Sequence, residues 1–198
     1  MNEKAKYRMS LANKLTFFRI ILTPVFFIIY IFPGKAAWTV PVLISIYIIS
    51  EVTDLLDGLA ARKLNETTDF GKLFDPFADT LMQITVFLCF VIDGIFPAFL
   101  LLIVLYREFG ILFIRNLMLK NGVTLGARFS GKLKTVSYIV AGGFALLTVS
   151  LQRLGIFEFI IPYFKTAAVV IFSISVLISA VSFFDYLVIY RKTQNNIQ

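Results

Sequence analysis

Four aspartates with a regular spacing lie where two long apolar stretches of the chain meet: Asp54, Asp57, Asp75 and Asp79. The members of each pair are three or four residues apart, so on a helix each pair shares one face. If the segment between the pairs lets two helices fold back as an antiparallel hairpin, all four carboxylates converge. Hard divalent cations relieve the repulsion in such a cluster, and two of them can polarise a phosphoryl group. The spacing therefore predicts a site for one or two cations, Mg²⁺ or Mn²⁺.

Helix capping is the plainer interpretation of these acidic residues, and it suits Asp69, which comes just before Gly71. Capping explains one or two carboxylates near a membrane interface. Asp54 and Asp79, however, each lie two or more turns inside apolar sequence, where an unpartnered charge costs about 3 kcal/mol. The cation site is therefore the favoured interpretation.

Membrane helices are the elements that must position these aspartates. The chain of 198 residues is 59% hydrophobic and 16% charged, with a mean hydropathy of +0.85, which is typical of a polytopic membrane protein. We predict an all-α fold that forms a single domain over 1–198. The predicted bundle has six transmembrane helices, over residues 15–32, 37–61, 72–92, 96–118, 133–151 and 160–190. Pro33-Gly34 ends the first of these spans, and Asp93-Gly94 predicts a tight turn after the third. Residues 1–14 suit either a short interfacial helix or a solvated tail.

The distribution of basic residues predicts the orientation of this bundle. With the N-terminus inside, the external ends and loops hold only Lys35, Arg153 and Lys165 of the 19 basic residues. This asymmetry predicts a protein with both termini in the cytoplasm and the aspartates near the cytoplasmic face. It also accounts for most of the net charge of +7, so no nucleic-acid partner is expected. The absence of targeting tracts favours a bacterial plasma membrane.

Several classes of site are excluded by composition. The chain has no His, which excludes an imidazole base, His-bound zinc and a Ser-His-Asp triad within it. The single Cys89 cannot form an intramolecular disulfide. Gly126, Gly131 and Lys132 match most of a phosphate-binding loop, but Leu133 follows and no buried strand precedes them, so a P-loop is rejected.

The segment over residues 54–79 carries the pattern D-x2-D-G-x2-A-R-x8-G-x3-D-x3-D at every fixed position. This pattern resembles the signature of the CDP-alcohol phosphotransferases, integral membrane enzymes of phospholipid synthesis. The resemblance implies that Asp54, Asp57 and Asp75 hold two divalent cations. It also implies that Asp79 supports the second cation and acts as the general base on the attacking hydroxyl. Homodimers are common in that family, so a homodimer is expected.

The same resemblance implies a pocket for the cytidine diphosphate moiety of the substrate. The implied pocket residues are Asn13, Thr16, Gly58, Arg62, Thr68 and Gly71. Other interpretations stay open from the residues alone. Asn13 and Thr16 also suit a helix cap, and Gly58 also suits close helix packing. Arg62 could clamp a diphosphate, or it could be one of the positive residues of a cytoplasmic loop.

A second basic set points to the acceptor substrate: Arg107, Arg115, Lys132 and Lys134. Arg107 and Glu108 lie inside the fourth predicted span, and an intramembrane Arg indicates a functional site by default. Mutual compensation of Arg107 and Glu108 is the plainer alternative. Cations beyond those needed for the diphosphate suggest that the acceptor is itself anionic and that these four residues bind its phosphate.

Glycerol 3-phosphate fits such an acceptor better than serine or a neutral polyol. The stretch GKLKT over 131–135 and the Arg107–Glu108 pair resemble the branch of the family that uses glycerol 3-phosphate. The expected reaction transfers a phosphatidyl group from CDP-diacylglycerol to glycerol 3-phosphate, giving phosphatidylglycerophosphate and CMP in phosphatidylglycerol synthesis. Serine or inositol phosphate as acceptor remains an alternative. A divalent-cation transporter is a further one, but it should place its carboxylates near the bilayer midplane.

Overall fold

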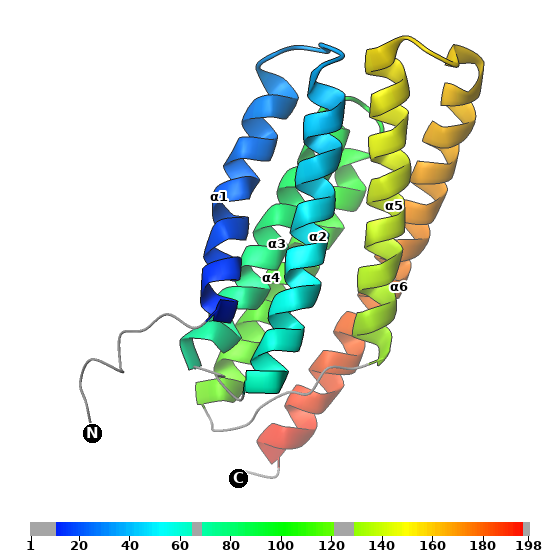
Figure 1. Cartoon of the computed structure of the whole chain (residues 1–198). Helices are drawn as coiled ribbons and strands as arrows, with labels where there is room; N and C mark the ends of the chain where they lie inside the picture. Colours follow the sequence, from blue (N-terminus) through cyan, green and yellow to red (C-terminus); the bar gives the residue numbers. More distant parts are fainter. Residues whose placement is uncertain (1–10, 65–68, 121–128, 196–198) are drawn as a thin grey trace. The chain divides into compact units, whose positions relative to one another are not determined.

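The computed structural model describes the backbone of residues 11–64, 69–120 and 129–195, and the side chains of residues 13–54, 56, 74–119 and 131–193 (Figure 1). Apart from the short turns between helices, these residues are helical and contain no strand, which confirms the all-α prediction. The helices are α1 (Leu11–Ile31), α2 (Thr39–Leu64), α3 (Asp69–Ile92), α4 (Ala98–Lys120), α5 (Phe129–Leu154), the short 3₁₀ helix η2 (Glu158–Ile160) and α6 (Ile161–Asn195).

Four of the described helices are long and apolar enough to cross a membrane. These stretches are Asn13–Ile31, Phe74–Ile92, Gly131–Leu154 and Glu158–Thr193. The remaining long helices, α2 and α4, carry charged residues within their apolar sequence, such as Asp54 and Arg107. The predicted count of six spans and the predicted orientation therefore stay predictions. Helix α6 has 35 residues and rises about 52 Å, so it overhangs a hydrocarbon core of about 30 Å.

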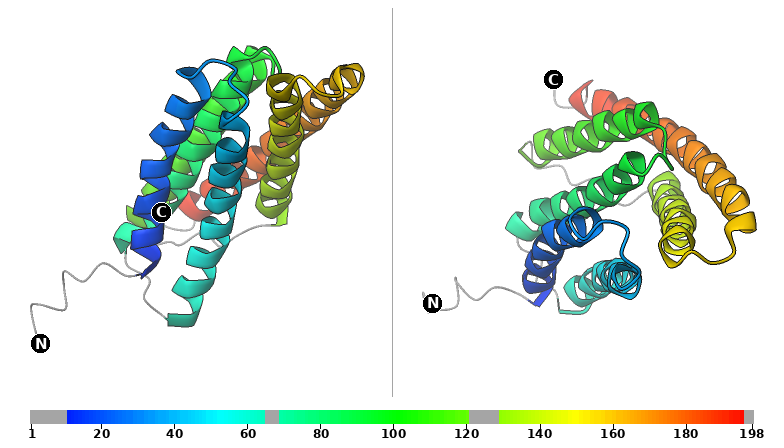
Figure 2. Two further views of the ribbon diagram at one scale, coloured as in Figure 1. Left: turned by 45° about the horizontal axis from the view of Figure 1, so that its top comes forward. Right: turned by 90° about the horizontal axis from the view of Figure 1, so that it is seen from above.

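The chain divides into two compact units, Met1–Thr85 and Val86–Gln198. The N-terminal unit contains α1, α2 and most of α3. A short turn joins α1 to α2, which lie side by side (Figure 2). Gly34 in this turn has a φ of +64°, a left-handed conformation that glycine adopts without strain. This turn follows Pro33, where the sequence predicts that the first span ends.

The C-terminal unit contains the end of α3 together with α4, α5, η2 and α6. Helix α6 packs along both α5 and α4, and Figure 2 shows α5 and α6 side by side. The turn between α3 and α4 contains Gly94 with a φ of +66°, which confirms the tight turn predicted at Asp93-Gly94. A Cβ atom at Gly110 of α4 would lie 2.9 Å from the ring of Phe183 on α6. Glycine at this position therefore lets the two helices approach closely.

Aromatic side chains form the centre of the C-terminal unit. The ring of Phe172 stacks on Phe96 with centroids 4.0 Å apart and meets the edge of Phe87 at 4.9 Å. Tyr138 meets Phe87 edge to face at 5.4 Å. All four side chains are buried. These contacts join the end of α3 and the residues just before α4 to α5 and α6.

Replacement of Phe172 should destabilise this unit. In Phe172→Leu three aromatic contacts are lost, those with Phe87, Phe96 and Tyr138, so the free energy of unfolding should fall by about 1.5–4 kcal/mol. Thermal unfolding of the detergent-purified protein measures the change. Leu177→Ala, on an exposed position of the same helix, is the control and should stay within about 0.5 kcal/mol of the wild type. Equal losses in the two variants would contradict the central role of the aromatic cluster.

Candidate active site

Helix α1 carries a polar face inside an otherwise apolar sequence. Asn13, Thr16, Arg19 and Thr23 follow one another at intervals of three or four residues, so they share one face of the helix. Thr16, Arg19 and Thr23 are buried. The hydroxyl of Thr23 donates to the Arg19 carbonyl oxygen at 2.9 Å. The helix therefore directs its polar groups into the N-terminal unit rather than toward lipid.

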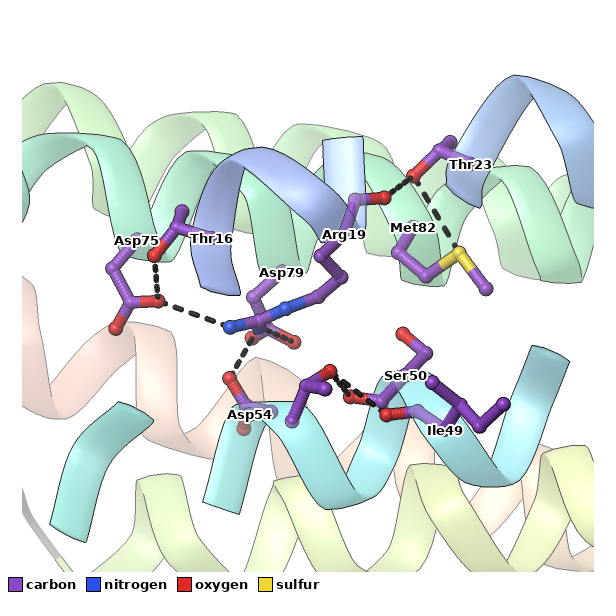
Figure 3. Close-up of polar contacts among 10 residues, drawn as sticks. Thr16, Arg19, Thr23, Ile49, Ser50, Asp54, Asp75, Asp79 and Met82 are labelled. Carbon is purple, nitrogen blue, oxygen red and sulfur yellow. Dashed lines mark hydrogen bonds and ion pairs between the residues drawn. The ribbon is translucent and has the colours of Figure 1, made fainter. Parts of the chain in front are cut away.

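The guanidinium of Arg19 gathers carboxylates from two other helices (Figure 3). Its Nη1 atom forms an ion pair with Asp54 Oδ1 on α2. Its Nη2 atom donates to Asp75 Oδ1 on α3 at 3.2 Å, and Nη1 lies 3.9 Å from Asp79 Oδ1. Thr16 Oγ1 donates to the same oxygen of Asp75 at 3.4 Å. Three of the four aspartates predicted to converge therefore do so around one side chain of α1.

Access to this cluster is asymmetric. The side chain of Arg19 is 1% exposed, whereas those of Asp54, Asp75 and Asp79 are 37%, 42% and 45% exposed. The carboxylates are thus held by Arg19 on one side and remain accessible on another. A ligand can reach the aspartates without displacing the helix that carries Arg19.

The donor set suits a hard divalent cation, because it consists of carboxylate oxygens gathered at one place. Three carboxylates and one guanidinium leave these groups with a net charge of −2, which attracts a further cation. Among the described side chains, no group of three acidic or Cys residues has the geometry to hold an ion directly. The side chain of Asp57, the fourth predicted ligand, lies outside the described side chains, so the complete ligand set stays a prediction.

The residues predicted to bind cytidine diphosphate are described only in part. Asn13 and Thr16 lie on the polar face of α1, and Thr16 contacts Asp75. Both lie inside the helix, because α1 already includes Leu11. Neither residue therefore caps this helix. The predicted residues Gly58 and Arg62 on α2 and Gly71 on α3 have helical backbones but lie outside the described side chains, and Thr68 lies outside the described residues altogether.

Two of the predicted acceptor residues meet in the C-terminal unit. Arg107 Nη1 and Lys134 Nζ donate to the two carboxylate oxygens of Glu108, at 2.8 and 2.9 Å. Arg107 also donates from Nε to the Ser179 carbonyl oxygen at 3.3 Å and from Nη2 to Ser182 Oγ at 3.2 Å. Arg107, Glu108 and Lys134 are buried. The cluster joins α4, α5 and α6 and keeps one net positive charge.

The other two predicted acceptor residues stand apart from this pairing. Arg115 donates from Nη2 to the Tyr186 hydroxyl at 3.1 Å, and its guanidinium lies over the Tyr186 ring at 5.5 Å. Lys132 is exposed. The compensation of Arg107 by Glu108, the plainer alternative raised by the sequence, is therefore present. Lys134 shares the same carboxylate, which was not predicted.

Arg19 is the central residue that sequence reasoning left without a role. The sequence does contain a signal for its functional role. Arg19 is a charged residue within an apolar helix, and it follows Asn13 and Thr16 at the same three-residue spacing. Glu51 was also left without a role. It lies one turn before Asp54 and its carboxylate repels those of Asp54 and Asp79. Both residues border the aspartates of the family signature.

The fold and the site together define an α-helical membrane protein whose buried arginine gathers carboxylates from two neighbouring helices. Residues 9–184 match the family model described as CDP-alcohol phosphatidyltransferase. The chain therefore belongs to the CDP-alcohol phosphatidyltransferase family, which confirms the resemblance of its aspartate pattern.

Curated bacterial proteins are similar to the chain over most of its length. A protein of Treponema pallidum (strain Nichols), named CDP-diacylglycerol–glycerol-3-phosphate 3-phosphatidyltransferase, is 40% identical over 90% of this chain and 88% of its own. A protein of Bacillus subtilis (strain 168) with the same name is 35% identical over 70% of this chain and 77% of its own. A probable phosphatidylglycerophosphate synthase of Mycobacterium tuberculosis (strain H37Rv) is 30% identical over 89% and 79%. The apolar helices and bacterial relatives indicate a multi-pass membrane protein.

Proposed function

We propose that this protein transfers a phosphatidyl group from CDP-diacylglycerol to glycerol 3-phosphate, giving phosphatidylglycerophosphate and CMP. The relatives from Treponema pallidum and Bacillus subtilis carry the name of this activity, CDP-diacylglycerol–glycerol-3-phosphate 3-phosphatidyltransferase. The observation that carries the proposal is the convergence of Asp54, Asp75 and Asp79, all from the family signature, on Arg19. The protein acts in phosphatidylglycerol synthesis.

Divalent cations, Mg²⁺ or Mn²⁺, are proposed cofactors of this site. Asp54, Asp57 and Asp75 would hold them, with Asp79 supporting the second. When bound, such cations neutralise the diphosphate of the substrate and polarise the phosphoryl group that is transferred. The partial exposure of the Asp54, Asp75 and Asp79 side chains supports this assignment, because a cation can reach their carboxylates.

Asp79 is the proposed general base. It accepts the proton of the attacking hydroxyl of glycerol 3-phosphate, whose oxygen then bonds to the phosphorus of the phosphatidyl group. The bond from that phosphorus to the bridging oxygen breaks, and CMP leaves with the electron pair. The 45% exposure of the Asp79 side chain supports the role, since the acceptor must reach it.

The remaining predicted residues form two sets, and each set is proposed to bind one of the two substrates. Asn13, Thr16, Gly58, Arg62, Thr68 and Gly71 form the proposed pocket for cytidine diphosphate. Arg107, Arg115, Lys132 and Lys134 are the proposed ligands of the acceptor phosphate. The net positive charge of the buried cluster around Glu108 supports an anionic acceptor. We further propose six spans in one domain, with both termini and the active site facing the cytoplasm at the plasma membrane, and a homodimer.

An acceptor panel tests the proposed reaction. Purified protein is incubated with CDP-diacylglycerol, Mg²⁺ or Mn²⁺, and glycerol 3-phosphate, serine or inositol phosphate, and the release of CMP is measured. Release with glycerol 3-phosphate alone is expected. Release with serine or inositol phosphate instead would establish another acceptor. Cation flux into proteoliposomes without release of CMP would establish the transporter.

Removal of Arg107 should weaken the binding of glycerol 3-phosphate but not that of CDP-diacylglycerol. In Arg107→Met the KM for glycerol 3-phosphate should rise about 10- to 100-fold, because a charge-assisted hydrogen bond contributes about 1.5–3 kcal/mol. The KM for CDP-diacylglycerol should change little. Steady-state kinetics with each substrate varied in turn separates the two effects. Lys192→Met, which removes an exposed charge from α6, is the control; an unchanged acceptor KM in Arg107→Met would contradict the assignment.

A further inference from the structure

Arg19 lies in the centre of the aspartate cluster, yet the proposed reaction assigns it no role. Its guanidinium lies within 3.9 Å of carboxylate oxygens from Asp54, Asp75 and Asp79, and these are the groups proposed to hold divalent cations. We propose that Arg19 is an internal counter-cation, which compensates these carboxylates and competes with divalent cations for them. This inference rests on the proposed cation site.

The contacts of Arg19 explain the competition. Nη1 and Nη2 approach the Oδ1 atoms of aspartates on two different helices, α2 and α3 (Figure 3). A lone pair that accepts a hydrogen bond from the guanidinium is not available to a metal ion at the same time. An ion bound by these aspartates would also lie close to the positive charge of Arg19, which repels it. The guanidinium thus lowers cation affinity through both geometry and charge.

The burial of Arg19 explains why it remains beside the carboxylates. Its side chain is 1% exposed, and a buried charge that loses its partners is strongly destabilising. The same ion pairs reduce the repulsion between Asp54 on α2 and Asp75 on α3. Arg19 should therefore stabilise the protein most when no divalent cation is bound.

Contact of Arg19 with the substrate diphosphate is the main competing explanation. The exposure of the groups argues against it, because the aspartates are 37–45% exposed while Arg19 is enclosed behind them. A diphosphate approaching the accessible side of the cluster meets carboxylates first. Arg19 is therefore assigned as a positioning residue and not as a catalytic one.

Mn²⁺ binding and thermal unfolding test the inference on the full-length, detergent-purified protein. In Arg19→Met, the dissociation constant for Mn²⁺ alone, measured by electron paramagnetic resonance, should fall at least tenfold relative to the wild type. The melting temperature of this variant should drop more in EDTA than in saturating Mn²⁺. The two results are linked, because a ligand that stabilises one form more also binds that form more tightly. Neither readout depends on turnover.

Lys14→Met is the matched control, since it removes one positive charge from an exposed position on the same helix; its Mn²⁺ affinity should stay within threefold of the wild type. Arg19→Gln, which keeps hydrogen-bond donors but loses the charge, replaces the Met variant if that variant does not fold. It should also bind Mn²⁺ more tightly than the wild type.

Unchanged or weaker Mn²⁺ binding by the Arg19 variants would overturn the inference, as would equal losses of melting temperature in EDTA and in Mn²⁺. Absence of Mn²⁺ binding from all proteins would overturn the cation site as well. Failure of the wild type to release CMP with glycerol 3-phosphate would instead refute the transferase and leave the affinity comparison standing.

Discussion

Asp79→Asn is expected to lower the rate of CMP release by about 10²–10⁴-fold, the range for loss of a general base. The amide has nearly the shape of the carboxylate but cannot accept the proton of the acceptor hydroxyl. Asp79 belongs to a partly exposed cluster around Arg19, so the substitution should leave the protein folded and able to bind nucleotide. Release of CMP under saturating substrates measures the effect.

Two measurements separate loss of the base from loss of the fold or of substrate binding. The melting temperature and the affinity for CDP should stay near the wild-type values in Asp79→Asn. Asp185→Asn, a half-buried aspartate of α6 outside the proposed site, is the control and should retain its turnover. Unchanged turnover in Asp79→Asn would refute the assignment of this residue as the base.

Removal of divalent cations should abolish the reaction. After treatment with excess EDTA, CMP release should fall by more than about 10³-fold, because the cations are proposed to supply several kcal/mol of charge stabilisation at the transferred phosphoryl group. Addition of Mg²⁺ or Mn²⁺ above the EDTA concentration should restore the rate. The assay is the same as for the acceptor panel.

EDTA that has first been saturated with Mg²⁺ provides the control for effects of the chelator on detergent or lipid, and it should not inhibit. Asp54→Asn should require a higher concentration of Mg²⁺ for half-maximal recovery, since it removes a proposed ligand. Full turnover by EDTA-washed protein in excess chelator would contradict the proposed dependence on cations.

Local signals in the sequence are sufficient to predict the six long helices and two of the turns between them. Apolar stretches of bilayer length predicted the helices, and Pro33-Gly34 and Asp93-Gly94 predicted turns, where both glycines have a left-handed φ. The membrane span count is harder to infer. Helix α4 carries three charged residues within its apolar sequence, Arg107, Glu108 and Arg115, so it is not among the helices that are apolar enough on composition alone.

The candidate site could be predicted only as far as helical periodicity reaches. The spacing of Asp75 and Asp79, and the position of Asp54 on the preceding helix, correctly predicted that these groups converge. Arg19 lies 35 residues from Asp54 in the chain, so their pairing depends on how α1 packs in the N-terminal unit. The sharing of Glu108 between Arg107 and Lys134 likewise depends on the packing of α4 with α5. Periodicity within one helix contains no information on either contact.

Ser179, Ser182 and Tyr186 follow one another along α6 at three- and four-residue intervals, and each contacts an arginine of α4. A slip of α6 by one turn, about 5.4 Å, would separate all three from their partners. The same slip would move the Phe183 ring away from Gly110, the one glycine of α4, which leaves room for that ring. The arginines of α4 thus help to fix the position of α6 along its axis. The exposed α6 side chains of Leu177, Val181 and Phe184 can therefore vary among apolar types without changing that position.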